Sequence, residues 1–273
     1  MQVNRRHILA LAAGGLVHAG LPPASARVLP VLPAGLRPIG HGRVVEVVDG
    51  DTVRLDTREQ VRFVGTQAPK LPLGRPGYPT WPFARESRAH LVSLVGGQRV
   101  SLHAGGAARD RHGRILAHLV TDDGTWIQGA MLEGGFARVY TFKDNRVPAR
   151  AMLALEAAAR EARRGLWADP TYRVRQAGEP DLATLADGVP GYHLVEGRVL
   201  DVGRSRGRWF LNFGRDHRTD FTATIAPEDA DLFADEGIDV HGLEGRRVRI
   251  RGWIEDRNGA SIDVTHPEQI ELF

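Results

Sequence analysis

The segment from Arg43 to Val64 constrains the fold more than any other part of the chain. Polar and apolar residues alternate on both sides of the pair Asp49-Gly50. An Asp-Gly pair between two alternating runs is a strong short-range signal of a β-hairpin. A second turn follows and leads into another apolar run at Val61. The sequence therefore predicts a three-stranded antiparallel meander.

The residues that follow add two more strands and two helices. A helix is predicted over residues 83–94, because it closes at a Gly-Gly pair, and strands are predicted over 99–103 and 115–120. A later helix begins near Pro148 and ends at Gly165. Five strands with one interposed and one appended helix are the inventory of an OB-fold barrel. We expect a mainly β protein with helices, of the α+β class.

The C-terminal third of the chain has a second set of alternating runs. A short acidic helix is predicted between the third and the fourth of five strands, which gives a second OB-like β-barrel. The predicted strands are residues 195–202, 209–213, 220–225, 246–254 and 261–264, and the helix is 227–236.

Charge and composition divide the chain between these two sets of strands. Residues 27–187 hold 23 basic and 17 acidic residues, a net charge of +6, whereas residues 188–273 hold 11 arginines and 16 acidic residues, a net charge of −5. Residues 171–190 contain two glycines and two prolines without a sustained apolar period, which is typical of a linker. We therefore expect an extended lead-in at 27–41, a first domain at 42–170, a linker at 171–190 and a second domain at 191–273.

The N-terminus has the pattern of an export signal. Arg5-Arg6 precede a short apolar run, and Ala24-Ser25-Ala26 offers small residues for cleavage. This predicts a twin-arginine signal peptide over residues 1–26 and a periplasmic or secreted protein. The apolar run is too short to span a bilayer, so stable membrane insertion is not expected. A disordered arm or a retained anchor is the alternative.

Three motifs, in order, carry a resemblance to a known family. They are residues 47–55 (VVDGDTVRL), residues 61–65 (VRFVG) followed by Pro69, and residues 110–114 (DRHGR). In order and approximate spacing they resemble the staphylococcal nuclease (thermonuclease) family over about residues 42–169. The resemblance implies a five-stranded barrel and a Ca²⁺-dependent phosphodiesterase, an endonuclease that acts on DNA or RNA. By position, Asp51 would ligate the metal, and Arg62 and Arg114 would bind phosphate.

Two further positions depart from the family pattern. The family has an aspartate and a glutamate where this chain has Gln67 and Lys70. A glutamine oxygen can ligate Ca²⁺ without contributing charge, but Lys70 introduces a cation at the position of the general base. Losing a general base costs about 10²–10⁴ in rate, so we expect impaired hydrolysis.

Several alternatives remain open at this site. Lys70 could be a solvated surface residue, could itself act as the base, or could point inward and replace the charge of the metal, binding phosphate without cutting. The missing carboxylate could come from Asp49, Glu59 or Glu86. Asp51 and Arg62 could also form a purely structural ion pair.

Three functions follow from these alternatives. The chain could be a Ca²⁺-dependent nuclease, a metal-free module that binds nucleic acid or another polyanion, or an exported envelope interaction scaffold. Tyr140 and Phe142 fall near the base-stacking aromatic residues of the family. In the second domain, arginines around Trp209 either bind single strands or pair with the acidic residues at 228–239. The chain has no cysteine, which excludes disulfides, thiolate metal sites and cysteine nucleophiles.

Overall fold

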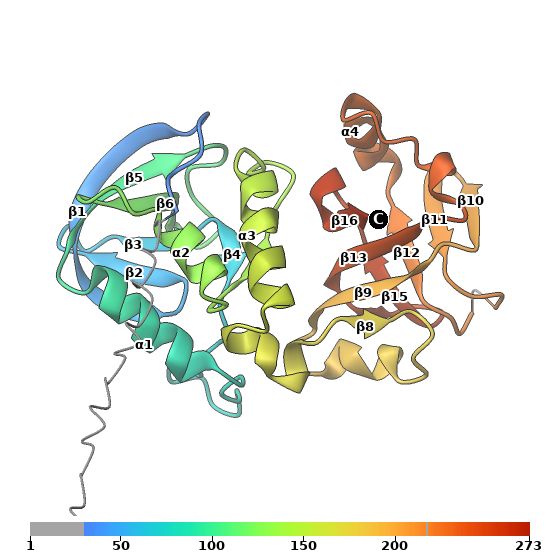
Figure 1. Ribbon diagram of the computed structural model, residues 1–273, viewed down its shortest axis with the longest axis horizontal. Helices are drawn as coiled ribbons and strands as arrows, with labels where there is room; N and C mark the ends of the chain where they lie inside the picture. The colour runs from blue at the N-terminus through green and yellow to red at the C-terminus, as the bar shows by residue number, and fades with distance from the viewer. Residues whose placement is uncertain (1–29, 217) are drawn as a thin grey trace, which may run out of the picture.

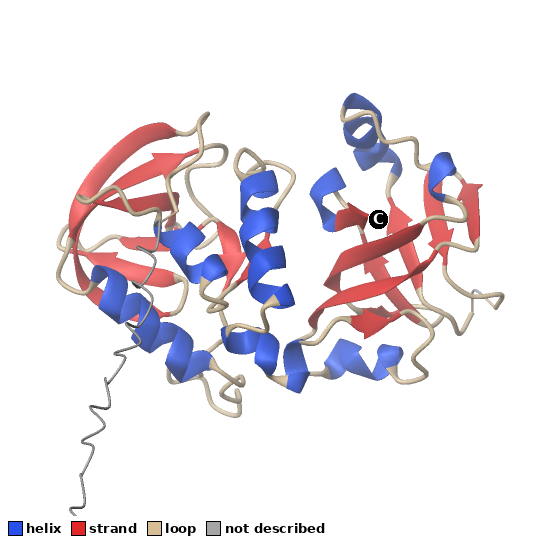
Figure 2. Cartoon of the chain, viewed as in Figure 1, coloured by secondary structure: helices blue, strands red, loops and turns tan. Residues whose placement is uncertain are grey.

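The computed structural model describes residues 30–216 and 218–273. The predicted export signal, residues 1–26, lies outside the described residues. The strands form two separate groups, with helices at their edges and between them (Figure 2). No helix within the described ranges is both long and apolar enough to cross a lipid bilayer.

The first group of strands is a closed five-stranded barrel (Figure 1). Strands β3 and β6 pair in parallel, and the other neighbours are antiparallel. This confirms the predicted α+β fold with an OB-type barrel. In ladder order the strands are β1 (Arg37–Asp49), β2 (Thr52–Leu55), β3 (Gln60–Phe63), β6 (Ile115–Thr121) and β5 (Arg99–Ala104).

Strand β1 closes the barrel because it pairs on both sides. Its first half, from Arg37 to Arg43, pairs with β5, and its second half, from Val44 to Asp49, pairs with β2. The expected lead-in over residues 27–41 is thus part of the barrel from Arg37 onward. Alternate residues of the strands point inward and form the barrel core, among them Val47, Val53, Val61 and Phe63.

Helices α1 (Ala84–Val95) and α2 (Ile127–Glu133) lie against barrel strands, and α3 (Ala149–Glu161) packs on α2. The sequence predicts α1 and α3 but gives no signal for the short α2. On α3, Met152 and Ala159 are buried, and Glu156 between them is also fully buried. Beside the barrel, β4 (Gly65–Gln67) pairs with β7 (Arg138–Tyr140).

The second group of strands forms two sheets and not one closed barrel among the described residues. Four of the five strands predicted for this part are present, whereas the first, residues 195–202, covers parts of two observed strands; the predicted helix appears as η4 (Pro227–Asp229) and α4 (Ala230–Asp235). One sheet holds β10 (Asp201–Ser205), β11 (Arg208–Asn212), β12 (Thr222–Ile225), β15 (Ala260–Asp263) and β14 (Glu255–Asp256), and the other holds β16 (Ile270–Leu272), β13 (Arg247–Trp253), β9 (Tyr192–Arg198) and β8 (Arg175–Gln176).

The segment 171–190, expected as a linker, packs onto the second part of the chain. Its strand β8 pairs in parallel with β9, and Leu182, in the 3₁₀ segment η3 (Leu182–Asp187), is buried in the second core. Short turns bury single side chains and leave no periodic pattern in the sequence, which explains the difference from the expectation.

The two parts share a buried interface between α3 and the strands β13 and β16 (Figure 1). Arg251, almost fully buried, donates to Glu156 at 2.7 Å. Arg160, near the end of α3, donates to Glu271 of β16 at 2.9 Å. An apolar cluster continues the interface and contains Ala159, Leu166, Trp167, Tyr172, Tyr192 and Leu194.

Candidate functional site

Asp51 lies in the turn between β1 and β2, inside the protein. A Cβ atom at Gly50 would lie 2.1 Å from Oγ of Ser87, so only glycine lets α1 pack this close to the turn. The Asp51 side chain is completely buried, and its Oδ2 accepts a hydrogen bond of 2.7 Å from the backbone N–H of Ala68. The turn therefore directs a carboxylate inward, toward the end of β4.

The Lys70 side chain points at this carboxylate. Its Nζ lies 2.6 Å from both carboxylate oxygens of Asp51 and 3.3 Å from Oδ2 of Asp49. Only 19% of the Lys70 side chain is exposed. Lys70 is therefore not a solvated surface residue, and the alternative that placed it there is wrong.

The charges in this cluster shift the two carboxyl groups in opposite directions. Burial by itself would raise the pKa of Asp51, but Arg62 and Lys70 hold that pKa well below its ordinary value. The pKa of Asp49 is raised by burial and by the neighbouring charge of Asp51. Asp51 is thus the ionised partner of Lys70 and Arg62, in a cluster that neutralises its own charge.

Arg62 is held in place by backbone oxygens as well as by Asp51. Its Nη1 donates to the carbonyl oxygen of Phe63 at 2.6 Å, and its Nη2 donates to that of Thr66 at 2.7 Å. Nη2 also lies 3.3 Å from Oδ2 of Asp51. The ion pair expected as the structural alternative is present, and the same guanidinium borders the cleft described below.

Gln67 does not join this cluster. Its Oε1 accepts a hydrogen bond of 2.9 Å from Nη2 of Arg138, across the ladder between β4 and β7. Successive residues of a strand point to opposite sides, so Thr66 borders the cleft and Gln67 faces away from it. The structure therefore does not bring the side chains of Gln67 and Asp51 together as two metal ligands.

The carboxylates considered as replacements do not complete a metal site either. Glu59 pairs with Arg109 at 2.6 Å, and Glu86 is exposed on α1. Within residues 30–216 and 218–273, no group of three or more acidic, histidine or cysteine side chains is placed to hold a metal ion. Ca²⁺ takes six to eight oxygen ligands, whereas both Asp51 oxygens here accept from Lys70. The residues as arranged do not fit Ca²⁺.

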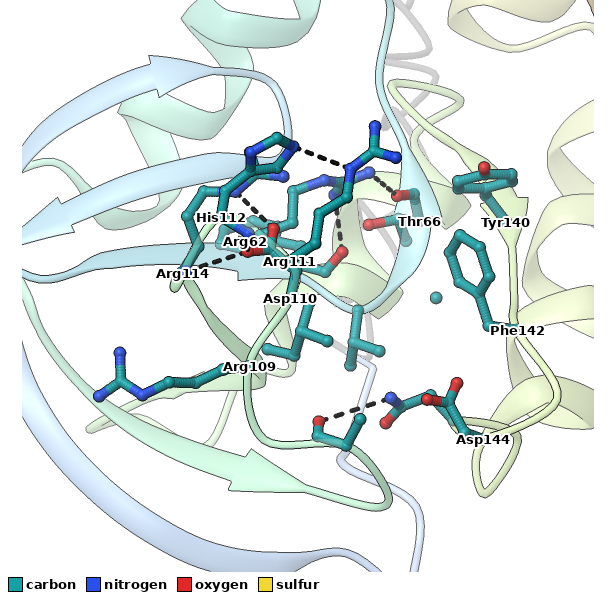
Figure 3. A pocket seen from close by; sticks show the side chains of 16 residues that line it. Arg62, Thr66, Arg109, Asp110, Arg111, His112, Arg114, Tyr140, Phe142 and Asp144 are labelled. Carbon is teal, nitrogen blue, oxygen red and sulfur yellow. Dashed lines mark hydrogen bonds and ion pairs between the residues drawn. The ribbon is translucent and has the colours of Figure 1, made fainter.

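A cleft of about 540 Å³ opens beside this cluster (Figure 3). One wall carries Arg62, Arg111 and Arg114, and the opposite wall carries Tyr140 and Phe142. The structure thus brings the two predicted phosphate-binding arginines into one cavity. Its volume falls in the range typical of small-molecule sites.

The two walls offer different chemistry. Arg114 is anchored by Asp110 through an ion pair of 2.7 Å, yet 31% of its side chain is exposed. Phe142 is half exposed, and its ring meets that of Tyr140 edge to face at 4.8 Å between centroids. Guanidinium groups suit phosphate oxygens, and aromatic faces suit nucleobases. The cleft can therefore accept a phosphate and an adjoining base together.

Sequence reasoning missed other residues around this site. Arg111 and His112 belong to the third motif but had no role assigned, and both line the cleft. Arg138, fully buried, donates to Gln67 and to the carbonyl oxygen of Tyr192. The third motif could have indicated Arg111 and His112. Arg138, by contrast, binds the carbonyl oxygen of Tyr192, 54 positions away, and no local sequence pattern reveals that contact.

For the arginine-rich hairpin of the second part, single-strand binding stays a prediction, and Asp229, one of the acidic residues expected to pair with it, has another partner. Trp209 packs against the second core, and Arg204 lies over its ring at 4.7 Å. Two of the acidic residues expected to pair with this hairpin bind the first part instead, since Asp229 pairs with Lys143 and Glu236 pairs with Arg146.

Comparisons with known proteins agree with the geometry of the barrel. The sequence profile of the family described as "Staphylococcal nuclease homologue" matches residues 60–169. An "Uncharacterized endonuclease" of Escherichia coli is 37% identical over 132 residues, which cover 47% of this chain and 78% of that protein. "Endonuclease YhcR" of Bacillus subtilis is 27% identical over 51% of this chain and 13% of its own length.

A thermonuclease of Staphylococcus hyicus is 23% identical over 135 residues, or 46% of this chain and 75% of that protein. The three motifs, the closed barrel and these similarities agree. Through the first part of its sequence, the chain belongs to the staphylococcal nuclease family.

Proposed function

We propose that this chain binds nucleic acid in the cleft without a metal ion and that its capacity for hydrolysis by the chemistry of the family is strongly reduced. The observation that carries the proposal is the position of Lys70, whose Nζ lies 2.6 Å from both oxygens of Asp51. An ammonium group in this position supplies the positive charge that a bound cation would otherwise provide.

The same position argues against hydrolysis. A general base must accept a proton from water, but Lys70 donates its protons to a buried carboxylate. Loss of a general base alone costs about 10²–10⁴ in rate. Within the described part of the chain, the carboxylate next to Asp51 is that of Asp49, and it also accepts a hydrogen bond from Lys70.

The cleft retains what binding requires. Arg111 and Arg114 can contact phosphate from one wall, while Tyr140 and Phe142 can stack on a base from the other. The net charge of +6 over residues 27–187 favours a polyanionic ligand. The relatives named as endonucleases support nucleic acid as that ligand.

We also propose that the protein is exported, on the pattern of Arg5-Arg6 and Ala24-Ser25-Ala26. N-terminal sequencing of the periplasmic protein should then begin at Arg27, and replacing Arg5-Arg6 by two lysines should block translocation. Protein that keeps Met1 in the soluble cytoplasm would refute export.

Fluorescence anisotropy with a labelled single-stranded oligonucleotide tests the binding proposal. Arg114→Ala should weaken binding about tenfold or more, because a hydrogen bond to a charged group contributes about 1.5–3 kcal/mol. Arg85→Ala, which removes an exposed arginine of α1 outside the cleft, is the control with the same change of charge. Equal effects of both variants would mean that the cleft is not the binding site. No binding by the wild-type protein would leave the scaffold function.

A further inference from the structure

The aromatic wall of the cleft belongs to one short segment, residues 140–146, which we call the wall segment. Tyr140, Phe142, Asp144 and Asn145 of this segment line the cleft (Figure 3). The residues between them point the other way, toward the second part of the chain.

Thr141 and Lys143 make two contacts between the wall segment and the second part of the chain. The hydroxyl of Thr141 lies 2.8 Å from Nε2 of His266, and both residues are buried. Nζ of Lys143 donates to Oδ1 of Asp229 at 2.7 Å. Asp229 is buried and belongs to η4, so the contact joins the wall segment to the acidic helical region of the second part.

Two more contacts hold the ends of the wall segment. Arg146 pairs with Glu268 at 2.8 Å and with Glu236 at 2.7 Å. At the other end, the indole N–H of Trp253 donates to the hydroxyl oxygen of Tyr140 at 3.1 Å. The second part therefore contacts the wall segment at both ends and twice between them.

We propose that the second part of the chain is a positioning element for the base subsite and that it fixes the ring of Phe142 opposite the arginines. This proposal rests on the proposed function, since it assigns the cleft a nucleic-acid ligand. A half-exposed ring on an unsupported loop would lose conformational freedom when a base stacks on it, and that ordering reduces affinity. Contacts made before binding remove part of this cost.

A comparison of the affinities for two matched probes separates this role from general electrostatics. One probe is a labelled hexamer of thymidine, and the other is the same hexamer with abasic tetrahydrofuran at every position. Both carry the same phosphates, so the ratio of their affinities reports the contribution of the bases. Stacking of one base contributes about 1–3 kcal/mol, or about 5- to 150-fold in affinity.

Asp229→Asn is the informative variant, because it weakens the contact with Lys143 from the far side of the cleft. It removes a negative charge, so general electrostatics would strengthen the binding of both probes. Positioning by the second part predicts that the affinity ratio falls about fivefold. Asp231→Asn is the control, since it removes an equal charge from an exposed position on α4 that does not contact the wall segment.

Hydrogen exchange provides a readout that needs no ligand. In Asp229→Asn the amides of residues 141–146 should exchange faster than in the wild type, whereas Asp231→Asn should leave them unchanged. Lys143→Arg retains the ion pair and should keep both the slow exchange and the wild-type affinity ratio.

The possible results distinguish the two proposals. A wild-type affinity ratio and wild-type exchange in Asp229→Asn would overturn the positioning role, even if Arg114→Ala still weakens binding of both probes. If the wild-type protein binds neither probe, the proposed function fails, and slow exchange that persists in Asp229→Asn would overturn the positioning role as well.

Discussion

Nζ of Lys70 lies 2.6 Å from each carboxylate oxygen of Asp51. These are the positions that, by family resemblance, correspond to the general base and to a metal ligand. Here they form an ion pair whose carboxylate is fully buried, with Arg62 3.3 Å away from the same carboxylate. Lys70 and Arg62 thus neutralise the negative charge of Asp51, which the family's chemistry would use to bind a metal.

Lys70→Met should lower the free energy of unfolding by about 3 kcal/mol, because removing one partner of a buried ion pair leaves an uncompensated charge. This cost lies at the lower end of the range of about 3–5 kcal/mol for breaking a buried ion pair, since Arg62 remains beside Asp51. Urea denaturation measures the change. Lys70→Arg is the control, and Lys70→Met combined with Asp51→Asn should cost less than the sum of the single changes. Additive costs would show that the two residues are not coupled.

The double variant Gln67→Asp with Lys70→Glu should acquire a Ca²⁺ dependence that the wild-type protein lacks. Without Ca²⁺ the carboxylate that replaces Lys70 repels Asp51, and bound Ca²⁺ relieves that repulsion. A thermal shift assay should show a melting temperature that rises with CaCl₂ for the double variant only, and phosphodiesterase activity should rise with it. Each single change should do less, because Gln67→Asp alone leaves Lys70 bound to Asp51 and Lys70→Glu alone leaves an uncharged side chain at position 67. An equal rise in the wild type would contradict this account.

His266 should make the protein less stable at acid pH. Burial lowers the pKa of His266 to about 4 from an ordinary value of about 6.5. The unfolded chain therefore binds a proton that the folded chain excludes between pH 6.5 and 4, and the free energy of unfolding falls as the pH falls through this window. At 1.36 kcal/mol per pKa unit, the maximum loss is about 3 kcal/mol.

Urea denaturation at a series of pH values measures this effect. Burial also lowers the pKa of His193 to about 4 and that of His118 to about 3, so the wild type reports all three groups. His266→Gln should flatten the dependence between pH 6.5 and 4 without removing it. The same slope in the wild type and the variant would show that His266 does not titrate as described.

The buried pair of Glu156 and Arg251 should make the two parts of the chain unfold together. Both side chains are buried and 2.7 Å apart, and they join α3 to β13. Tryptophan fluorescence and circular dichroism should therefore give one coincident urea transition. Glu156→Gln should lower the free energy of unfolding by about 3 kcal/mol, since Arg251 loses one of the two acidic partners that it has among the described residues and retains Glu271. Two separate transitions in the wild type would contradict a shared interface.

The barrel could be predicted from sequence because its signals are local. The alternation around Asp49-Gly50 places β2 at Thr52–Leu55, and the motif order places Arg62 and Arg114 in one cleft. The direction of a side chain that binds a distant partner could not be predicted in this way. Gln67 faces away from Asp51 because β4 pairs with β7, about 70 residues later in the chain.

The interface between the two parts escaped prediction for the same reason. Glu156 lies among alanines on α3 and has the sequence context of a solvated helix face. Its partner Arg251 is 95 residues away, in a strand of the other part. Similarly, nothing near Lys143 indicates Asp229 as its partner. Such contacts depend on how the two parts pack, which a single sequence does not encode locally.

The most direct test of metal-free binding follows one labelled single-stranded oligonucleotide with wild-type residues 27–273, first in EDTA and then in a Ca²⁺ titration. Anisotropy reports binding, and gel electrophoresis of the same samples reports cleavage. The account predicts the same dissociation constant in EDTA and in Ca²⁺, with at most trace cleavage in either, because Lys70 supplies the charge beside Asp51. Binding that requires Ca²⁺, together with efficient Ca²⁺-dependent cleavage, would contradict it.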